Sequence, residues 1–157
     1  MNPKAKILTG IAGEYFVAGE LSRRGYTACI TLRNTPHIDV LASDGKRAVN
    51  IQVKTRCIER SSGWDLGNKP LEYENVKNNI FYVLVAISSD EEKREIVYYI
   101  IQKKKLNKLV ERNFQDHLKT PRNNGQPRIT KRRIFRMNYH PKFQVAKYKD
   151  RWNILFD

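Results

Sequence analysis

The sequence lacks several features that mark common classes of protein. It has only two cysteines, Cys29 and Cys57, whose spacing fits no zinc pattern and whose thiols we expect to be reduced. The apolar run Phe81–Ile87 is far shorter than the roughly 20 residues of a membrane span. No P-loop and no helix-turn-helix signature are visible. Because the first residues also lack the apolar segment of a signal peptide, we expect a cytoplasmic protein without a membrane or zinc role.

Acidic residues are scarce compared with basic ones. The 157 residues include 30 Lys and Arg but only 16 Asp and Glu, which gives a formal net charge of +14. The excess lies mainly in residues 103–136, which contain 12 basic and 2 acidic side chains. An imbalance of this kind is typical of proteins that bind a polyanion, most often nucleic acid, although a soluble basic protein without such a partner remains an alternative.

Length and composition indicate one folded domain, which we expect to cover residues 1–157. Hydrophobic residues make up 40% and charged residues 29% of the chain, values typical of a globular domain. The order of the expected elements predicts an α/β fold with a mixed sheet flanked by helices. Apolar periodicity and turn residues predict helices over 3–24, 103–119 and 143–156, strands over 26–32, 37–42, 47–56, 81–88 and 96–102, irregular segments over 61–79 and 120–127, and an ambiguous segment over 128–138.

A predicted hairpin over residues 37–56 carries polar side chains on one face. Alternation along a strand places Asp39, Asn50, Gln52 and Lys54 on the face opposite to the apolar residues. With the turn at 43–46, residue 42 pairs with 47, so Asp39 lies opposite Asn50 and diagonal to Gln52. The alternative is that these residues have no catalytic role, because a sheet with one face in water also needs polar residues at such positions.

Glu14 adds a second carboxylate to this pattern. On a helical wheel it falls inside the apolar stripe formed by Ile7, Ile11, Ala18 and Leu21. A carboxylate that faces a core is costly unless it is paired, protonated or bound to a metal. The alternative is a side chain at the edge of the stripe that reaches water.

These residues resemble the PD-(D/E)XK nuclease superfamily, which has a restriction endonuclease-like fold. The resemblance rests on a helical Glu14, on Asp39 in the first hairpin strand, and on Gln52 and Lys54 in a [E/Q]-x-K arrangement on the second. It covers about residues 10–56 and is greatest to archaeal Holliday junction resolvases and to restriction endonucleases that attack methylated DNA. The sequence departs from the pattern where Ile38 replaces the name-giving proline and Gln52 replaces the commoner acidic ligand.

The resemblance implies a Mg²⁺-dependent DNA endonuclease, with Mn²⁺ as a second candidate ion. Asp39, the Gln52 amide oxygen and the Val53 carbonyl would be metal ligands, and Glu14 would hold metal-bound water or a second ion. Lys54 would orient the attacking water and stabilise charge on the phosphoryl group. An amide ligand adds no charge, so metal affinity is expected to be weaker than with Glu.

The partner implied by charge and resemblance together is DNA, either duplex or branched. Cutting both strands would favour a homodimer, for which the sequence indicates no interface. Two alternatives remain: a nucleic-acid-binding protein of the same fold without catalysis, and a ribosome- or RNA-associated basic protein. The residues expected to contact nucleic acid are Asn50, Arg56, Lys103, Lys104, Lys105, Arg122, Arg128, Lys131, Arg132 and Arg133.

Overall fold

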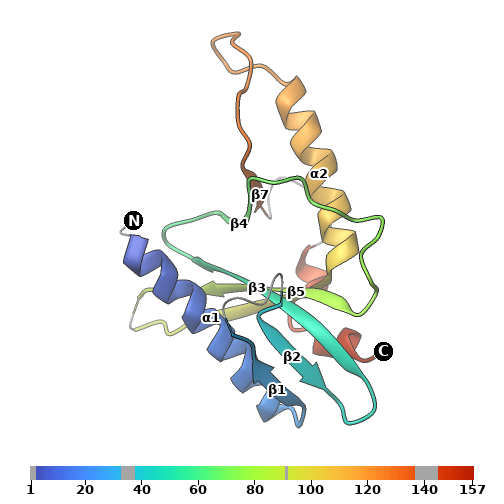
Figure 1. Cartoon of the computed structure of the whole chain (residues 1–157). Coiled ribbons are helices and arrows are strands. Elements are labelled where there is room, and N and C mark those ends of the chain that lie inside the picture. The colour runs from blue at the N-terminus through green and yellow to red at the C-terminus, as the bar shows by residue number, and fades with distance from the viewer. Residues whose placement is uncertain (1–2, 33–37, 91, 137–144) are drawn as a thin grey trace.

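A computed structural model describes residues 3–32, 38–90, 92–136 and 145–157. Its main sheet has five strands in the order β1-β2-β3-β5-β6, and a separate two-stranded ribbon joins β4 to β7 (Figure 1). Strands β3 and β5 are parallel and the other neighbours are antiparallel, so the predicted α/β fold with a mixed sheet is confirmed. The elements are α1 Pro3–Arg23, β1 Thr27–Ile30, β2 Val40–Ser43, β3 Ala48–Cys57, β4 Gly63–Gly67, β5 Ile80–Ile87, β6 Ile96–Gln102, α2 Lys103–Lys119, β7 Arg133–Arg136, and the 3-10 helices η2 Val145–Tyr148 and η3 Trp152–Leu155.

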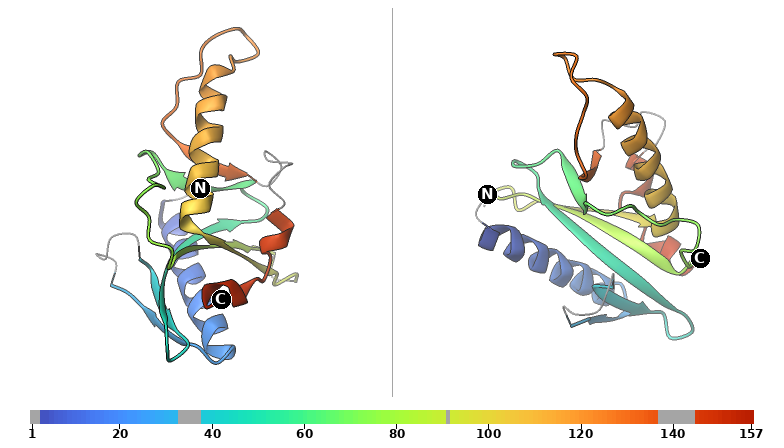
Figure 2. Two further views of the ribbon diagram at one scale, coloured as in Figure 1. Left: turned by 90° about the vertical axis from the view of Figure 1, so that its right-hand side faces the viewer. Right: turned by 45° about the horizontal axis from the view of Figure 1, so that its top comes forward.

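The two faces of the main sheet are covered by different elements (Figure 2). Helix α1 packs on one face, where its buried Val17 and Leu21 join Ile51 of β3 and Val83 of β5 in one apolar cluster. The other face is covered by α2 and the β4–β7 ribbon, whose side chains form a second cluster around Trp64. The central strand β5 contributes to both clusters, which explains its continuous apolar sequence.

The hairpin of β2 and β3 keeps the predicted faces but not the predicted pairing. Residue 42 pairs with Val49 rather than with residue 47, and the turn occupies residues 44–47. The Asp44 carboxylate accepts main-chain hydrogen bonds from Lys46 and Arg47, and Gly45 has a φ of 89°, so the turn residues themselves fix this loop. The pairing is displaced by two residues, and a shift of two leaves every side chain on its own face.

Strand β3 is longer than β2, and this leaves part of one edge open. It pairs with β2 over Ala48–Ile51 and with β5 over residues 50–57. Within the described part of the chain, residues 52–57 therefore have a strand partner on the β5 side alone. This open edge runs past Gln52 and Lys54, the residues that the sequence pattern selected.

The ribbon of β4 and β7 was predicted only in part. The segment 61–79 was expected to be irregular, but Gly63–Gly67 forms β4, while the ambiguous segment 128–138 contains β7. Trp64 is fully buried and its indole N–H donates to the Val85 carbonyl at 2.7 Å, which anchors β4 on the main sheet. A short strand with glycine at both ends carries little local signal, and its partner lies far away in the sequence.

Two predictions about helices are wrong. The segment 143–156, whose first two residues lie outside the described ranges, contains two short 3-10 helices in place of one α-helix. Asp150, between them, has a φ of 51° and its N–H donates to the Tyr98 carbonyl, so a contact with β6 interrupts the helical pattern. Ile7, predicted to face the core, is 53% exposed, since the buried positions of α1 begin only at Gly13. No helix in the described ranges is long and apolar enough to cross a membrane.

Candidate active site

Asp39 lies directly before β2 and is held against β3 by both its main chain and its side chain. Its N–H donates to the Ile51 carbonyl at 2.9 Å, and its Oδ2 accepts the Val53 N–H at 2.7 Å. Its carbonyl accepts the Thr31 N–H at 3.0 Å. These bonds fix the carboxylate at the open edge of β3, and none of them uses Oδ1.

Gln52 and Lys54 line one cleft on the α2 side of the sheet. The cleft has a volume of about 390 Å³ and is closed on its far side by the loop that follows β4 and by α2. Gln52 pairs with Tyr82 of β5, so it lies on the face away from α1, as the alternation predicted. The amide oxygen Oε1 of Gln52 is buried and has no hydrogen-bond donor among the described residues. A buried acceptor of this kind needs a partner such as water or a cation.

The oxygens at this edge suit a hard divalent cation. In a strand the N–H and C=O of one residue point to the same side, so the Val53 N–H that reaches Asp39 implies that the Val53 carbonyl also points to the open edge. One carboxylate, one orphaned amide oxygen and one main-chain carbonyl are ligand types that Mg²⁺ and Mn²⁺ accept. In the described ranges no three His, Cys, Asp or Glu side chains gather, so the donor set is poor in charge.

A second ammonium group, that of Lys103, reaches the same cleft. Lys103 begins α2, and its Nζ lies 5.6 Å from the centre of the Tyr82 ring. Burial and the nearby Lys54 lower the pKa of Lys103, while Asp39 opposes this effect. Burial also raises the pKa of Tyr82, with a smaller contribution from Asp39. The charges of Asp39 and Lys54 therefore act on Lys103, and that of Asp39 acts also on Tyr82.

Tyr82 and Asn107 are cleft residues that sequence reasoning missed. Tyr82 lay within an apolar run that indicated only a buried strand. Asn107 is 2% exposed on α2, its Nδ2 donates to the Glu72 carbonyl at 2.6 Å, and its Oδ1 has no partner among the described residues. The signal for Asn107 was a polar residue next to the apolar stripe of its helix, beside Leu106 and Val110.

Glu14 lies on α1, which packs on the opposite face of the sheet. Its neighbour Gly13 packs so closely that a Cβ there would lie 1.9 Å from Thr55 Oγ1. Glu14 thus directly follows the residue at which α1 meets β3, and it is half-buried rather than fully buried. It does not line the cleft that Gln52 and Lys54 share, and its role at a metal stays a prediction.

The residues expected to contact nucleic acid are dispersed in the structure. Arg133 is 5% exposed, its guanidinium forms two hydrogen bonds with Glu111 at 2.6 and 2.8 Å, and it lies over the Phe114 ring. The expectation that Arg133 contacts nucleic acid does not fit this burial, because the charge already has an internal partner. Arg132 is more exposed and bonds to Asp65 at 2.7 Å.

The other predicted contacts differ in exposure. Arg56 stacks over Trp64 with its guanidinium carbon 4.6 Å from the ring centre, and Asn50 is half-buried beside β5. Arg122 and Arg128 lie together in the loop beyond α2, which protrudes from the molecule (Figure 1). Lys104, Lys105 and Lys131 are exposed.

The similarity of this chain to known proteins lies in its fold rather than in its sequence. No family model and no curated protein matches the sequence. The structure is similar to that of a bacterial homing endonuclease, I-Ssp6803I, with a TM-score of 0.55 and 13% identity over 99% of this chain and 93% of that one. The chain has a restriction endonuclease-like fold. A Holliday junction resolvase of Archaeoglobus fulgidus, Hjc, also matches, with a TM-score of 0.45 and 15% identity over 85% of this chain and 88% of that one. The restriction endonuclease-like fold was the fold expected from the hairpin motif.

Proposed function

We propose that this protein is a divalent-metal-dependent DNA endonuclease that hydrolyses phosphodiester bonds. The observation that carries the proposal is the arrangement at the open edge of β3. There the Asp39 carboxylate is fixed by the Val53 N–H, and Gln52 presents a buried amide oxygen without a donor. The restriction endonuclease-like fold and the net charge of +14 support the same function.

Asp39, Gln52 and the Val53 carbonyl would hold the ion, which is Mg²⁺ or Mn²⁺ by the chemistry of the oxygen donors. When bound, such an ion activates water and relieves charge on the phosphoryl oxygens. Glu14 would contribute a second carboxylate from α1. Asp39 needs no rearrangement for this role, since its hydrogen bond to Val53 already orients the carboxylate.

Lys54 and Lys103 supply the positive charge that a phosphodiester needs in this cleft. Lys54 would contact the scissile phosphate and stabilise the charge that develops on it during attack. Lys103 lies close enough to Lys54 for the two positive charges to affect each other, and together they raise the electrostatic potential of the cleft, which favours an anion. The partly enclosed cleft strengthens both interactions compared with bulk water.

A second candidate function is nucleic-acid binding without catalysis. It is favoured by the charge-poor donor set, in which Gln52 stands where a carboxylate would bind the ion more tightly. The two functions differ in the response to Gln52→Glu. In a working metal site the added carboxylate should tighten Mg²⁺ binding, and cleavage should persist or increase.

The experiment is cleavage of a panel of duplex, flapped, four-way and methylated DNA by the wild type and Gln52→Glu, with Mg²⁺, with Mn²⁺ and with EDTA. Metal-dependent cutting by the wild type supports the nuclease. If neither protein cuts any substrate although both bind DNA, the nuclease proposal is wrong and the second candidate function, nucleic-acid binding without catalysis, stands.

A further inference from the structure

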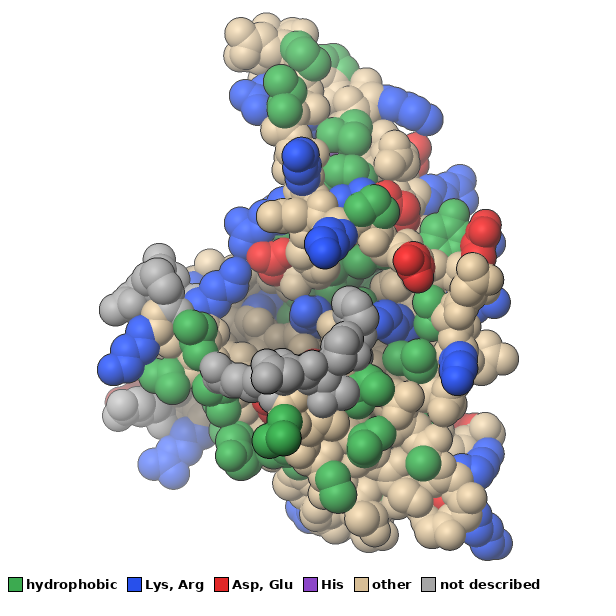
Figure 3. Space-filling view, viewed as in Figure 1, with side chains coloured by type: hydrophobic (Ala, Val, Ile, Leu, Met, Phe, Trp, Pro, Cys, Tyr) green, Lys and Arg blue, Asp and Glu red, His purple; other side chains and the backbone are tan. Residues whose placement is uncertain are grey.

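A second cleft lies between the N-terminal half of α1, the end of β3 and the β4–β7 ribbon. Its volume is about 530 Å³. In Figure 3, Lys and Arg side chains border a hollow in this region. We call it the basic cleft, and its charged side chains are Lys6, Arg56, Arg60, Asp65, Arg132 and Arg136.

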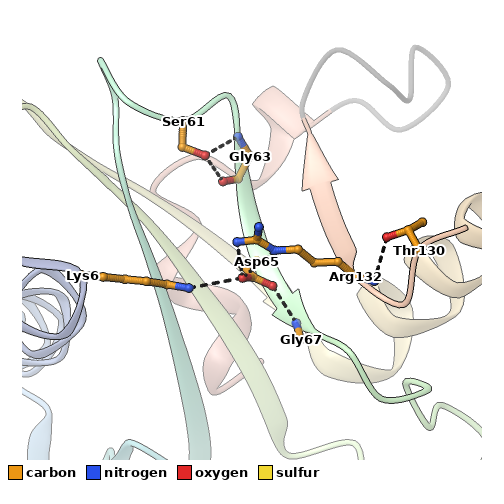
Figure 4. A network of polar contacts seen from close by, with 7 residues as sticks. All are labelled: Lys6, Ser61, Gly63, Asp65, Gly67, Thr130 and Arg132. Carbon is orange, nitrogen blue, oxygen red and sulfur yellow. Dashed lines mark hydrogen bonds and ion pairs between the residues drawn. The ribbon is translucent and has the colours of Figure 1, made fainter. Parts of the chain in front are cut away.

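Asp65 is the single acidic side chain that lines the basic cleft, against five cations, and it fixes two of them. Arg132 donates to Asp65 Oδ2 from Nε at 3.0 Å and from Nη2 at 2.7 Å, and Lys6 donates to the same oxygen at 3.4 Å (Figure 4). The carboxylate thereby ties α1, β4 and the approach to β7 together. Arg60 and Arg136 have no side-chain partner among the described residues, so the cleft keeps a positive excess.

Two further groups in the basic cleft have unused donors. Arg56 is held by stacking on Trp64 and by a hydrogen bond from Nη1 to the Ser61 carbonyl, yet its buried Nε has no acceptor in the described part of the chain. The Thr55 hydroxyl, at the floor of the cleft beside Gly13, is also buried without a partner. Fixed, unsatisfied donors beside free cations fit an anionic ligand that carries many acceptor oxygens.

The basic cleft continues the candidate active site along the same strand. Lys54 belongs to the first cleft, and residues 55–57 line the second. A strand rises about 3.3 Å per residue, so residues 54 and 57 lie roughly 10 Å apart. A DNA backbone in the basic cleft would therefore lie within a few nucleotides of the candidate active site.

We propose that the basic cleft binds the sugar-phosphate backbone of DNA within a few nucleotides of the phosphate that would lie at Asp39 and Lys54. The position of this contact relative to the cleaved phosphate rests on the proposed nuclease function, whereas DNA binding by the basic cleft does not depend on it. Guanidinium groups match phosphate oxygens in charge and geometry, and four of them line the basic cleft, those of Arg56, Arg60, Arg132 and Arg136. The protruding loop with Arg122 and Arg128 is not required for this contact.

The first test measures DNA binding by the metal-free protein in EDTA, where cleavage plays no part. Each lost contact to duplex phosphate should reduce the slope of log K against log[salt] by about 0.9, so Arg60→Ala with Arg136→Ala should make it about 1.8 shallower. The matched control is Lys46→Ala with Lys108→Ala, two exposed cations outside both clefts. Equal slopes for the two double variants, with native circular dichroism, would overturn the proposal.

The second test uses the two native thiols of the unaltered chain. Cys57 lines the basic cleft, whereas Cys29 is exposed on β1. Bound duplex should slow the alkylation of Cys57 by iodoacetamide several-fold and leave Cys29 unchanged. Unchanged rates at both thiols with saturating DNA would contradict the proposal. Equal protection by polyglutamate would replace DNA with acidic protein as the partner.

The two proposals can fail separately. If Asp39→Ala leaves cleavage intact while Cys57 is protected by DNA, the proposed active site is wrong and the basic cleft stands. If Asp39→Ala abolishes metal-dependent cleavage while both measurements on the cleft are negative, the nuclease stands and its DNA follows another surface.

Discussion

The β2–β3 hairpin and the basic segment 103–136 were the two regions in which the sequence indicated chemistry, and they differ in how their side chains are used. In the hairpin, Gln52 and Lys54 lie on the predicted face and meet in one cleft. In the basic segment, neighbouring cations have unrelated surroundings: Arg132 bonds to Asp65 at the surface, whereas Arg133 is buried with Glu111. Position in a strand was thus more informative than the number of charges.

The difference has a physical cause. Side-chain direction in a strand alternates with a period of two, so it survived the two-residue error in the pairing of Val49. The partner of a charged side chain, in contrast, is set by segments that are distant in sequence. Glu111 lies on α2, so the end of that helix and a loop separate it from Arg133, and Asp65 lies on a strand that sequence patterns did not reveal.

The largest expected effect concerns Asp39. Replacing it by Ala or by Asn should abolish metal-dependent cleavage, because both changes remove the full negative charge assigned to the ion. Asp39→Asn keeps an oxygen that can accept the Val53 N–H and should therefore melt close to the wild type. Cleavage assays with Mg²⁺ and thermal melts check the two parts. Activity of either variant near the wild-type level would remove the hairpin from the site.

Lys54→Ala should lower the rate of cleavage by about 10²- to 10³-fold, since one electrostatic group that stabilises the transition state is lost. Metal binding, measured by calorimetry, should be unchanged, because the ammonium is not a ligand. Lys108→Ala, on the exposed surface of α2, removes the same charge elsewhere and serves as the control. Similar rates for the two variants would mean that net charge, rather than position on β3, matters.

Within the basic segment, Arg133 and its neighbour Arg132 should differ in their effect on stability. Arg133→Ala leaves Glu111 without its partner in a largely buried site and should cost about 3 kcal/mol of unfolding free energy. Arg132→Ala removes an exposed pair with Asp65 and should cost less than about 1 kcal/mol. Urea unfolding measures both, and equal losses would contradict the division between a buried and an exposed cation.

The pH dependence of the stability lost in Arg133→Ala shows whether the charge of the pair causes the loss. The hydrogen bond from Arg133 lowers the pKa of Glu111 in the folded state. Stability from this pair is therefore full above the unfolded pKa of about 4.3 and is lost as the pH falls through the folded pKa. The difference between the wild type and Arg133→Ala should shrink below about pH 4. A difference that stays constant down to pH 3 would mean that lost packing, rather than charge, causes the effect.

Another expected effect on stability concerns the contact between β3 and α1. Gly13→Ala places a methyl group against the Thr55 side chain and should cost about 1–3 kcal/mol, because its carbon would lie 3.0 Å from the Thr55 Cβ, which no change of rotamer moves. Gly19→Ala, on the same helix, meets nothing within 4 Å and should stabilise the protein by about 0.5–1 kcal/mol. Thermal melts of both variants compare them, and a neutral Gly13→Ala would mean that α1 is seated less closely on β3.

Local patterns accounted for most of the elements that build the site. The turn residues around Gly45 and the alternation in β3 indicated the hairpin, and the apolar run of β5 indicated a central strand. Strand β4 and the contribution of Asn107 escaped prediction, because each depends on a contact with a distant segment. The exposed start of α1 was missed for a related reason: periodicity shows which face of a helix is apolar but not how far the sheet beneath it extends.

By itself the sequence determined which residues share a face, because the periods of strands and helices are properties of the backbone and need no partner. This pattern was enough to predict that Gln52 and Lys54 share a face and to indicate a restriction endonuclease-like fold. Only the tertiary structure decided which charges remain available to a ligand. Arg133 forms an ion pair with Glu111 inside the protein, and Lys103 lines the same cleft as Lys54. The cations of the cleft around Asp65 come from three separate segments of the chain. Such pairing depends on which elements meet in space, and no periodicity in the chain encodes it.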